Sequence, residues 1–271
     1  MMSNNSDMMG NNSETWRWVD EDPIEKLLRP SPGPEHPGAG SAAESLMAEG
    51  FAQFGRLQFE EAAGSYAAAV AAEPDHPTAH YDLGVCLEKL AQWKAAANSF
   101  RRALELDPGR WQALVGLGAC LLHLEGGEQA LACFEQALHS GAPPEPALLG
   151  KAVALQKLGR YEAAEEAYRE LLEINPGSAE PLANLIALSA ARKDAVKIGE
   201  YSRRLLRVHP QSKAALQGLA TLAIWNGDRA AAIDYCTRLV EVDPDSFEGW
   251  FNLRFAQQRM SAPERAARSI A

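Results

Sequence analysis

Prolines recur along this chain at a fixed interval of 34 residues, and this period constrains the fold more than any other feature of the sequence. A fixed period of this length is typical of chains built from stacked supersecondary units. The residue at the one missing step, position 142, is an alanine that precedes Pro143. The members of the series are Pro74, Pro108, Pro176, Pro210 and Pro244. The period predicts six units, which cover 43–76, 77–110, 111–144, 145–178, 179–212 and 213–246.

Each unit carries the spacing of two amphipathic helices. Apolar residues at i, i+3, i+4 and i+7 give a helix one apolar stripe, and a proline stops the helix that precedes it. Alanine, the best helix former, supplies much of the 46% hydrophobic content, whereas aromatic residues make up only 7% of the chain. We therefore expect an all-α protein. In the second unit the pattern consists of Leu83, Gly84 and Leu87, then Ala96, Phe100 and Ala103, and finally Pro108.

These recurring residues resemble the tetratricopeptide repeat, whose signature is W-x2-L-G-x2-Y, then A-x3-F, then P. The resemblance spans the six units and implies a right-handed α-solenoid of about six helix pairs within 41–271. Residues 247–271 begin a seventh unit, with Trp250 and Leu253 in the expected places. We expect this segment to form a C-terminal capping helix, because a solenoid needs its last apolar face covered. Its polar residues are Arg254, Gln257, Gln258 and Arg259.

Small residues predict where the helices of a unit cross. Glycine at a crossing lets two helix axes approach, and a large side chain can fill the space beside it. We expect Gly84 and Gly118 at close crossings, next to Phe100 and Phe134. The fifth unit departs from this pattern, since it has Ile186 in place of glycine, and Ile198 and Ser202 at the alanine and aromatic positions.

The resemblance also implies a concave groove lined by the first helix of each unit. In this family positions 2, 5, 9, 12 and 13 face the groove, and here they are mainly apolar, which favours binding of an apolar helix or extended peptide. Tight winding could instead bury these residues between units, above all Phe51 and Val85. No unit pairs Lys at position 5 with Asn at position 9, so we expect no clamp for a C-terminal carboxylate. The predicted groove residues are Met47, Phe51, Phe54, Tyr81, Val85, Lys89, Val115, Leu122, Leu149, Val153, Lys157, Trp225, Phe251 and Phe255.

The first forty residues form a separate tail. Residues 1–15 are polar, a composition typical of disorder, and 30–40 form a proline-rich linker. Between them, 15–29 is too apolar for a plain spacer. We expect it to cover the first repeat, to fold into the groove of its own or a neighbouring solenoid, or to dock on another protein. The residues of this candidate docking segment are Trp16, Trp18, Ile24, Leu27 and Leu28.

Charge, cysteine usage and the lack of known motifs argue against several classes of function and location. The net charge of −10 argues against nucleic-acid and anionic-membrane binding. No secretory signal or stretch long enough to insert in a membrane is visible, and the four cysteines form no CxxC pair, so we expect a cytoplasmic protein. No metal or cofactor motif occurs; His76 and His80 have Pro77 between them, and we expect His80 to replace the packing tryptophan of its unit.

We therefore expect a non-enzymatic scaffold or adaptor that binds a protein or peptide partner in the groove. The alternative is a self-assembling or autoregulatory protein, in which the segment with Trp16 and Trp18 packs on its own or a neighbouring solenoid.

Overall fold

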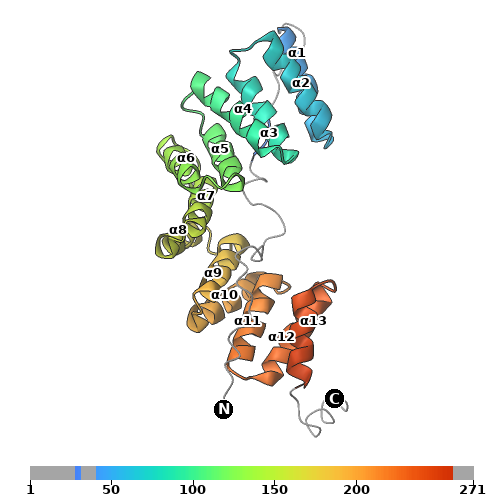
Figure 1. The fold of residues 1–271 in the computed structure, drawn as a ribbon, viewed down its shortest axis with the longest axis vertical. Coiled ribbons are helices and arrows are strands. Elements are labelled where there is room, and N and C mark those ends of the chain that lie inside the picture. Colours follow the sequence, from blue (N-terminus) through green and yellow to red (C-terminus); the bar gives the residue numbers. More distant parts are fainter. Residues whose placement is uncertain (1–27, 32–40, 259–271) are drawn as a thin grey trace. The chain divides into compact units, whose positions relative to one another are not determined.

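The computed structural model describes residues 28–31 and 41–258, and within these ranges the chain forms thirteen α-helices and no strand (Figure 1). The described residues divide into two compact groups, with the division inside α9, between Pro181 and Leu182. One group contains residues 28–31 and the helices α1 (Ala42–Gly55), α2 (Phe59–Ala72), α3 (Pro77–Lys89), α4 (Trp93–Leu106), α5 (Trp111–His123), α6 (Gly127–His139), α7 (Pro144–Lys157) and α8 (Tyr161–Ile174). The other contains most of α9 (Ala179–Ala191) with α10 (Ala195–Val208), α11 (Lys213–Trp225), α12 (Arg229–Val242) and α13 (Phe247–Gln258).

The 34-residue period appears directly in the helix starts. The first helices of four pairs begin at Pro77, Trp111, Ala179 and Lys213, and the terminal helix begins at Phe247, each in step with that period. The two helices of a pair pack together, as in α1 with α2 and α3 with α4, and the second helix of a pair packs on the next pair, as in α2 with α3. The predicted all-α solenoid is therefore confirmed. No helix in the described ranges has the length and apolar character needed to cross a membrane.

Two glycines lie against each of two aromatic rings, those of Phe100 and Phe134. A Cβ atom added at Gly84 would lie 2.7 Å from the Phe100 ring, which confirms the predicted close crossing. A Cβ atom at Gly116, in the next pair, would lie 2.6 Å from the same ring. The Phe134 ring repeats this arrangement, with Gly118 on its own pair, at 2.7 Å, and Gly150 on the next. Each ring is therefore shared by two successive units.

The fifth unit fills the same crossing with a large side chain at the glycine position and a small one at the aromatic position. Ile186 occupies the glycine position and Ser202 the aromatic position, and both side chains are buried. Both lie against Gly218 of the next pair, where an added Cβ would come within 2.9 Å of Ile186. A large residue on the first helix thus compensates for a small one on the second, and such volume-conserving exchanges are the kind that cores tolerate best.

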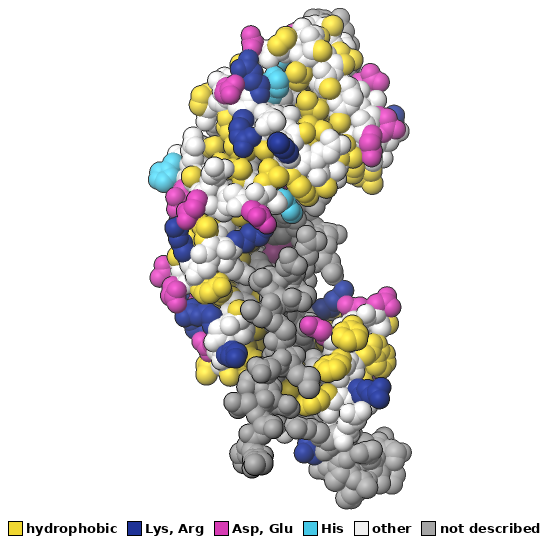
Figure 2. Space-filling model, in the orientation of Figure 1, with side chains coloured by type: hydrophobic (Ala, Val, Ile, Leu, Met, Phe, Trp, Pro, Cys, Tyr) yellow, Lys and Arg dark blue, Asp and Glu magenta, His cyan; other side chains and the backbone are white. Residues whose placement is uncertain are grey.

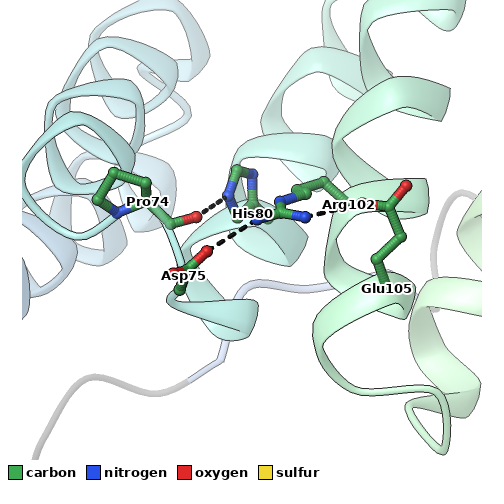
Figure 3. Close-up of polar contacts among 5 residues, drawn as sticks. All are labelled: Pro74, Asp75, His80, Arg102 and Glu105. Carbon is green, nitrogen blue, oxygen red and sulfur yellow. Dashed lines mark hydrogen bonds and ion pairs between the residues drawn. The ribbon is translucent and has the colours of Figure 1, made fainter.

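The turn between α2 and α3 is held by polar contacts that Figure 3 shows. The ring of His80 donates from Nε2 to the carbonyl oxygen of Pro74 at 2.8 Å. Five periods later, the Trp250 indole donates to the carbonyl oxygen of Pro244, also at 2.8 Å. The expectation that His80 replaces the packing tryptophan is therefore confirmed. His76 acts as the N-cap of α3, because its Nδ1 accepts from the Ala79 N–H at 3.3 Å.

The terminal helix α13 covers the last pair but is not purely polar. Leu253 and Ala256 pack into one cluster with buried residues of α11 and α12. The polar residues Arg254, Gln257 and Gln258 are exposed as expected, and Arg259 lies outside the described residues. Large aromatic side chains are exposed as well, with Phe247 at 80%, Phe251 at 60% and Trp250 at 52% exposure.

Candidate peptide-binding face

The first helices of the pairs form the inner face of the α1–α8 group. Within that group α1 contacts α3, α3 contacts α5, and α5 contacts α7. No two of the second helices α2, α4, α6 and α8 approach each other to a comparable extent in the described structure. A row of elements that is closely spaced on one side and open on the other curves toward the close side. The first helices therefore lie on the concave side.

The predicted groove residues differ in how much surface they offer. The side chains on α3, α5 and α7 are largely packed, so the expected burial between units is correct for Val85 but wrong for Phe51, which is 40% exposed. Lys157 is exposed, and its ammonium group donates to the Leu122 carbonyl oxygen at 2.8 Å. Met47, Tyr81, Val85, Val115, Leu122 and Leu149 are buried, and Phe54, Lys89 and Val153 are half-buried.

The predicted groove residues of the C-terminal group are more open. Trp225 is 36% exposed, Phe255 37% and Phe251 60%. Figure 2 shows hydrophobic side chains gathered on the part of the surface that α13 occupies. These residues belong to the other compact group and offer an apolar surface of their own.

A short extended segment of the N-terminal tail lies on α3. Its residues alternate between buried and exposed positions: Leu28 is 2% exposed, Arg29 is exposed, Pro30 is buried and Ser31 is half-buried. Alternation of this kind is expected when an extended chain lies on a surface, because successive side chains point to opposite sides. Of the candidate docking segment, only Leu28 belongs to the described part; Trp16, Trp18, Ile24 and Leu27 lie outside it.

Three side chains of the second unit bind the main chain and the hydroxyl group of this segment. The Tyr81 hydroxyl donates to the Arg29 carbonyl oxygen at 3.0 Å, and the Ser31 N–H donates to Asp82 Oδ1 at 2.8 Å. Arg110, the residue before α5, donates from Nη2 to the Ser31 hydroxyl oxygen at 3.0 Å. We name Tyr81, Asp82 and Arg110 the second-unit cluster.

Arg110 also holds the cluster together. Its Nη1 donates to Thr78 Oγ1 at 3.0 Å, and its guanidinium carbon lies 4.7 Å from the centre of the Tyr81 ring. A planar guanidinium over an aromatic face is favourable because of the charge distribution of the ring. The guanidinium is thus oriented by α3, which also carries the other two members of the cluster.

Asp82 is the unusual member, because its carboxyl group has no exposed surface. Burial raises its pKa from the ordinary 3.8 to about 7, while the Ser31 hydrogen bonds and the Arg110 charge act in the opposite direction. Burial, and next the Asp82 charge, also raise the pKa of Tyr81, so that the phenol remains a hydrogen-bond donor at neutral pH. Asp82 Oδ2 has no hydrogen-bond partner among the described residues.

The second-unit cluster is not part of the repeat framework. The position of Tyr81 is occupied by Val115 and Leu149 in the next two units. The position of Asp82 is occupied by glycine in units three, four and six, as at Gly116. The position of Arg110 is occupied by proline or serine in units three to six. Because these units adopt the same helix pair without the cluster, the fold does not require it.

Sequence reasoning identified Tyr81 and Leu28 but missed Asp82, Arg110 and Ser31. One signal was present in the sequence. At a position where three other units carry glycine, two of them (Gly116 and Gly150) against an aromatic ring, the second unit carries a carboxylate. A charged residue at a packing position is expensive to bury and therefore indicates a partner for the charge.

Stacked 34-residue helix pairs with an extended segment on the inner face define a class, the helical-repeat interaction proteins. Two family models of the tetratricopeptide repeat match residues 146–178 and 214–246. The family model of the middle TPR-like domain of cilia and flagella-associated protein 70 matches residues 42–156. The chain is a tetratricopeptide repeat protein.

Solved structures with the same fold come from several systems. PilW, described as a widely conserved type IV pilus biogenesis factor, has a TM-score of 0.69 and 20% identity, and the match covers 81% of this chain and 100% of PilW. PilF from Pseudomonas aeruginosa has a TM-score of 0.65 and 19% identity, with 81% and 98% covered. MamA from Desulfovibrio magneticus RS-1 has a TM-score of 0.60 and 20% identity, with 64% and 98% covered. A search of curated proteins found no match. At these identities the likeness shows the fold alone.

Proposed function

We propose that this protein is a non-enzymatic scaffold or adaptor that binds an extended segment of a partner protein on the inner face of α1–α8. The tetratricopeptide fold implies a protein partner, and proteins of this fold are generally interaction scaffolds rather than enzymes. The position of residues 28–31 carries the finer proposal. A segment of the tail lies on this face, where its main chain is hydrogen-bonded to Tyr81 and Asp82, and its Leu28 side chain is buried.

The chemistry of this face suits an extended peptide. Tyr81 supplies a donor for a main-chain carbonyl and Asp82 an acceptor for a main-chain N–H. Main-chain hydrogen bonds give affinity to such complexes, while alternate side chains that enter apolar surface give specificity. The net charge of −10 supports protein rather than nucleic-acid partners.

Site-specific photo-crosslinking on the full chain tests this function. A photoreactive residue at Val153, half-buried at a groove position of α7, should capture a discrete set of partners from the native cell. The control is the same residue at Glu166, which is exposed on α8, the second helix of the same pair. Equal capture at both positions would refute binding on the inner face.

The same observation favours a second candidate, self-recognition by the N-terminal tail. Under this alternative the segment with Trp16 and Trp18 packs on its own solenoid or on a neighbouring one. Deletion of residues 1–40 should then lower the thermal midpoint and increase binding of an apolar dye. An unchanged midpoint would exclude it, and a midpoint that depends on protein concentration would indicate exchange between chains.

A cytoplasmic location belongs to the proposal as well. All four cysteines are free thiols, and burial raises the pKa of Cys86 to about 12 and that of Cys236 to about 11. Inert, unpaired thiols are ordinary in a reducing compartment. Cell fractionation that recovers the protein outside the cytoplasm would contradict this assignment.

A further inference from the structure

We propose that the second-unit cluster is a sequence-selective site for a short extended segment of the pattern Leu-x-Pro-Ser, and that Leu28–Ser31 of the same chain is its resident ligand, which a partner segment of the same pattern must displace. This inference rests on the proposed function and names the recognised chemistry.

The pattern follows from how the four residues contact the site. Leu28 and Pro30 are buried, which favours apolar residues at these two positions, whereas the exposed Arg29 side chain places no demand on its position. Proline has no N–H, so burying residue 30 leaves no main-chain donor without a partner. The groups that do need partners, the Arg29 carbonyl and the Ser31 N–H, receive Tyr81 and Asp82.

Ser31 is recognised through two of its groups. Its N–H donates to the Asp82 carboxylate at 2.8 Å, and its hydroxyl oxygen accepts from Arg110 at 3.0 Å. The site thus presents an acceptor and a charged donor to one residue. Hydrogen bonds to charged groups are stronger than those between neutral groups, so this position should contribute most to selectivity.

The segment supplies a hydrogen-bond partner to a buried carboxylate. With the segment in place Asp82 is fully buried, its Oδ1 accepts from the Ser31 N–H, and its Oδ2 lacks a hydrogen-bond partner in the described structure. A buried polar group without any partner costs its desolvation energy, so this N–H offsets part of the cost of burying Asp82. Since the other units fold without such a carboxylate, its presence at Asp82 is best explained by a ligand.

The connection to α1 makes the resident segment a strong competitor. Only the nine residues 32–40 separate Ser31 from Ser41, the N-cap of α1. A short tether of this kind gives an effective concentration on the order of millimolar. A partner peptide in trans therefore binds weakly until the resident segment is weakened.

The test uses the full chain and a fluorescent peptide with the sequence of residues 24–36, followed by anisotropy. Leu28→Asp places a charge in a buried position and should expel the resident segment. This host should bind the peptide at least about tenfold more tightly than the wild type, because the tethered competitor is lost. The matched control is Arg29→Ala, which changes an exposed neighbour and should bind like the wild type.

A second substitution identifies the site. Tyr81→Phe in the Leu28→Asp host removes one hydroxyl and should weaken peptide binding roughly fivefold, the weight of one hydrogen bond. The peptide with Ser31→Pro lacks the N–H for Asp82 and should lose most of its affinity. Equal binding by the wild type and Leu28→Asp, or no effect of Tyr81→Phe, overturns the proposal.

Two further measurements cover the remaining outcomes. If Leu28→Asp fails to fold, the exchange rate of the Ser31 amide proton in the intact protein tests the docking. This rate should be slow in the wild type and several-fold faster in Tyr81→Phe. A fast rate in the wild type would refute docking. If sedimentation shows a dimer that Leu28→Asp dissociates, the resident ligand belongs to a second copy and the assignment to the same chain is wrong. If the peptide-binding test fails but crosslinking at Val153 still captures partners, the proposed scaffold function stands and only the Leu-x-Pro-Ser site is refuted. If the peptide binds as expected but Val153 captures no partner, only the scaffold function is refuted.

Discussion

Replacing Gly118 by alanine tests whether a shared ring joins successive units. The new Cβ atom would lie 2.7 Å from the Phe134 ring, closer than real Cβ contacts occur. A ring edge that faces open space could move away. The Phe134 ring is fully buried and Gly150 of the next pair also lies closely against it, so it has little room to move.

The magnitude follows from two opposing terms. Overpacking a well-packed core costs about 1–3 kcal/mol. Glycine to alanine inside a helix contributes about 0.8–1.0 kcal/mol in the favourable direction. We therefore expect Gly118→Ala to lower the free energy of unfolding by up to about 2 kcal/mol, and Gly118→Leu to lower it further. Gly64→Ala is the control, because Gly64 lies within α2 with nothing within 4 Å of an added Cβ. Only the favourable term applies there.

Urea unfolding followed by circular dichroism measures both variants. Gly118→Ala should move the midpoint to lower urea and Gly64→Ala to higher urea. In a Phe134→Leu background the smaller side chain leaves space, so Gly118→Ala should become neutral or stabilising, which is the coupling expected of residues in contact. A shift of the same sign for both glycines, or an unchanged effect of Gly118→Ala in the Phe134→Leu background, would refute the reasoning.

The remaining predictions concern Asp82, the fifth unit and one surface ion pair. Since burial raises the pKa of Asp82 to about 7, the native state binds this proton more tightly than the unfolded chain, and the Asp82 contribution to stability falls from about pH 4 to pH 7. Asp82→Asn removes this titration, so denaturant midpoints of the variant should rise relative to wild type across that window; a constant difference would contradict it. Ser202→Phe should destabilise by about 1–3 kcal/mol because Ile186 and Gly218 already fill the space, and adding Ile186→Gly should recover most of the loss in thermal unfolding. Arg102 pairs with Asp75 and Glu105 at 2.8 Å on the surface (Figure 3), and Arg102→Ala should leave the thermal midpoint almost unchanged in 1 M salt, where such pairs are screened.

Repetition made the fold predictable. Because the same pattern recurs in six units, it predicts the helix pairs, the crossings at Gly84 and Gly118 and the role of His80. Each of these features depends on contacts within a unit or with the adjacent turn. Gly116 and Gly150 were not predicted as second contacts of the rings, since that requires knowing which turn of the next pair approaches. Phe51 remains exposed because no helix pair precedes α1 in the described stack, whereas Val85 lies between two neighbouring first helices.

The candidate site was less predictable because its contacts are not periodic. Ser31 is 51 residues from Asp82 and 79 from Arg110 along the chain, and no local pattern relates them. The groove positions carried over from the family included Tyr81 but not Asp82, which stands at a packing position. Sequence comparison between units identifies Asp82 as an exception, but only the placement of residues 28–31 shows what it contacts.

The rings shared between neighbouring units have a consequence for how the stack comes apart. Phe100 touches α3 and α5, and Phe134 touches α5 and α7, so α5 cannot fray without disturbing a ring on each side. In a linear array, such shared contacts are the nearest-neighbour term that converts independent units into one cooperative block. Amide protons of α3, α5 and α7 should therefore exchange with nearly one common opening free energy, so that this region behaves as a single stiff element rather than three separable modules.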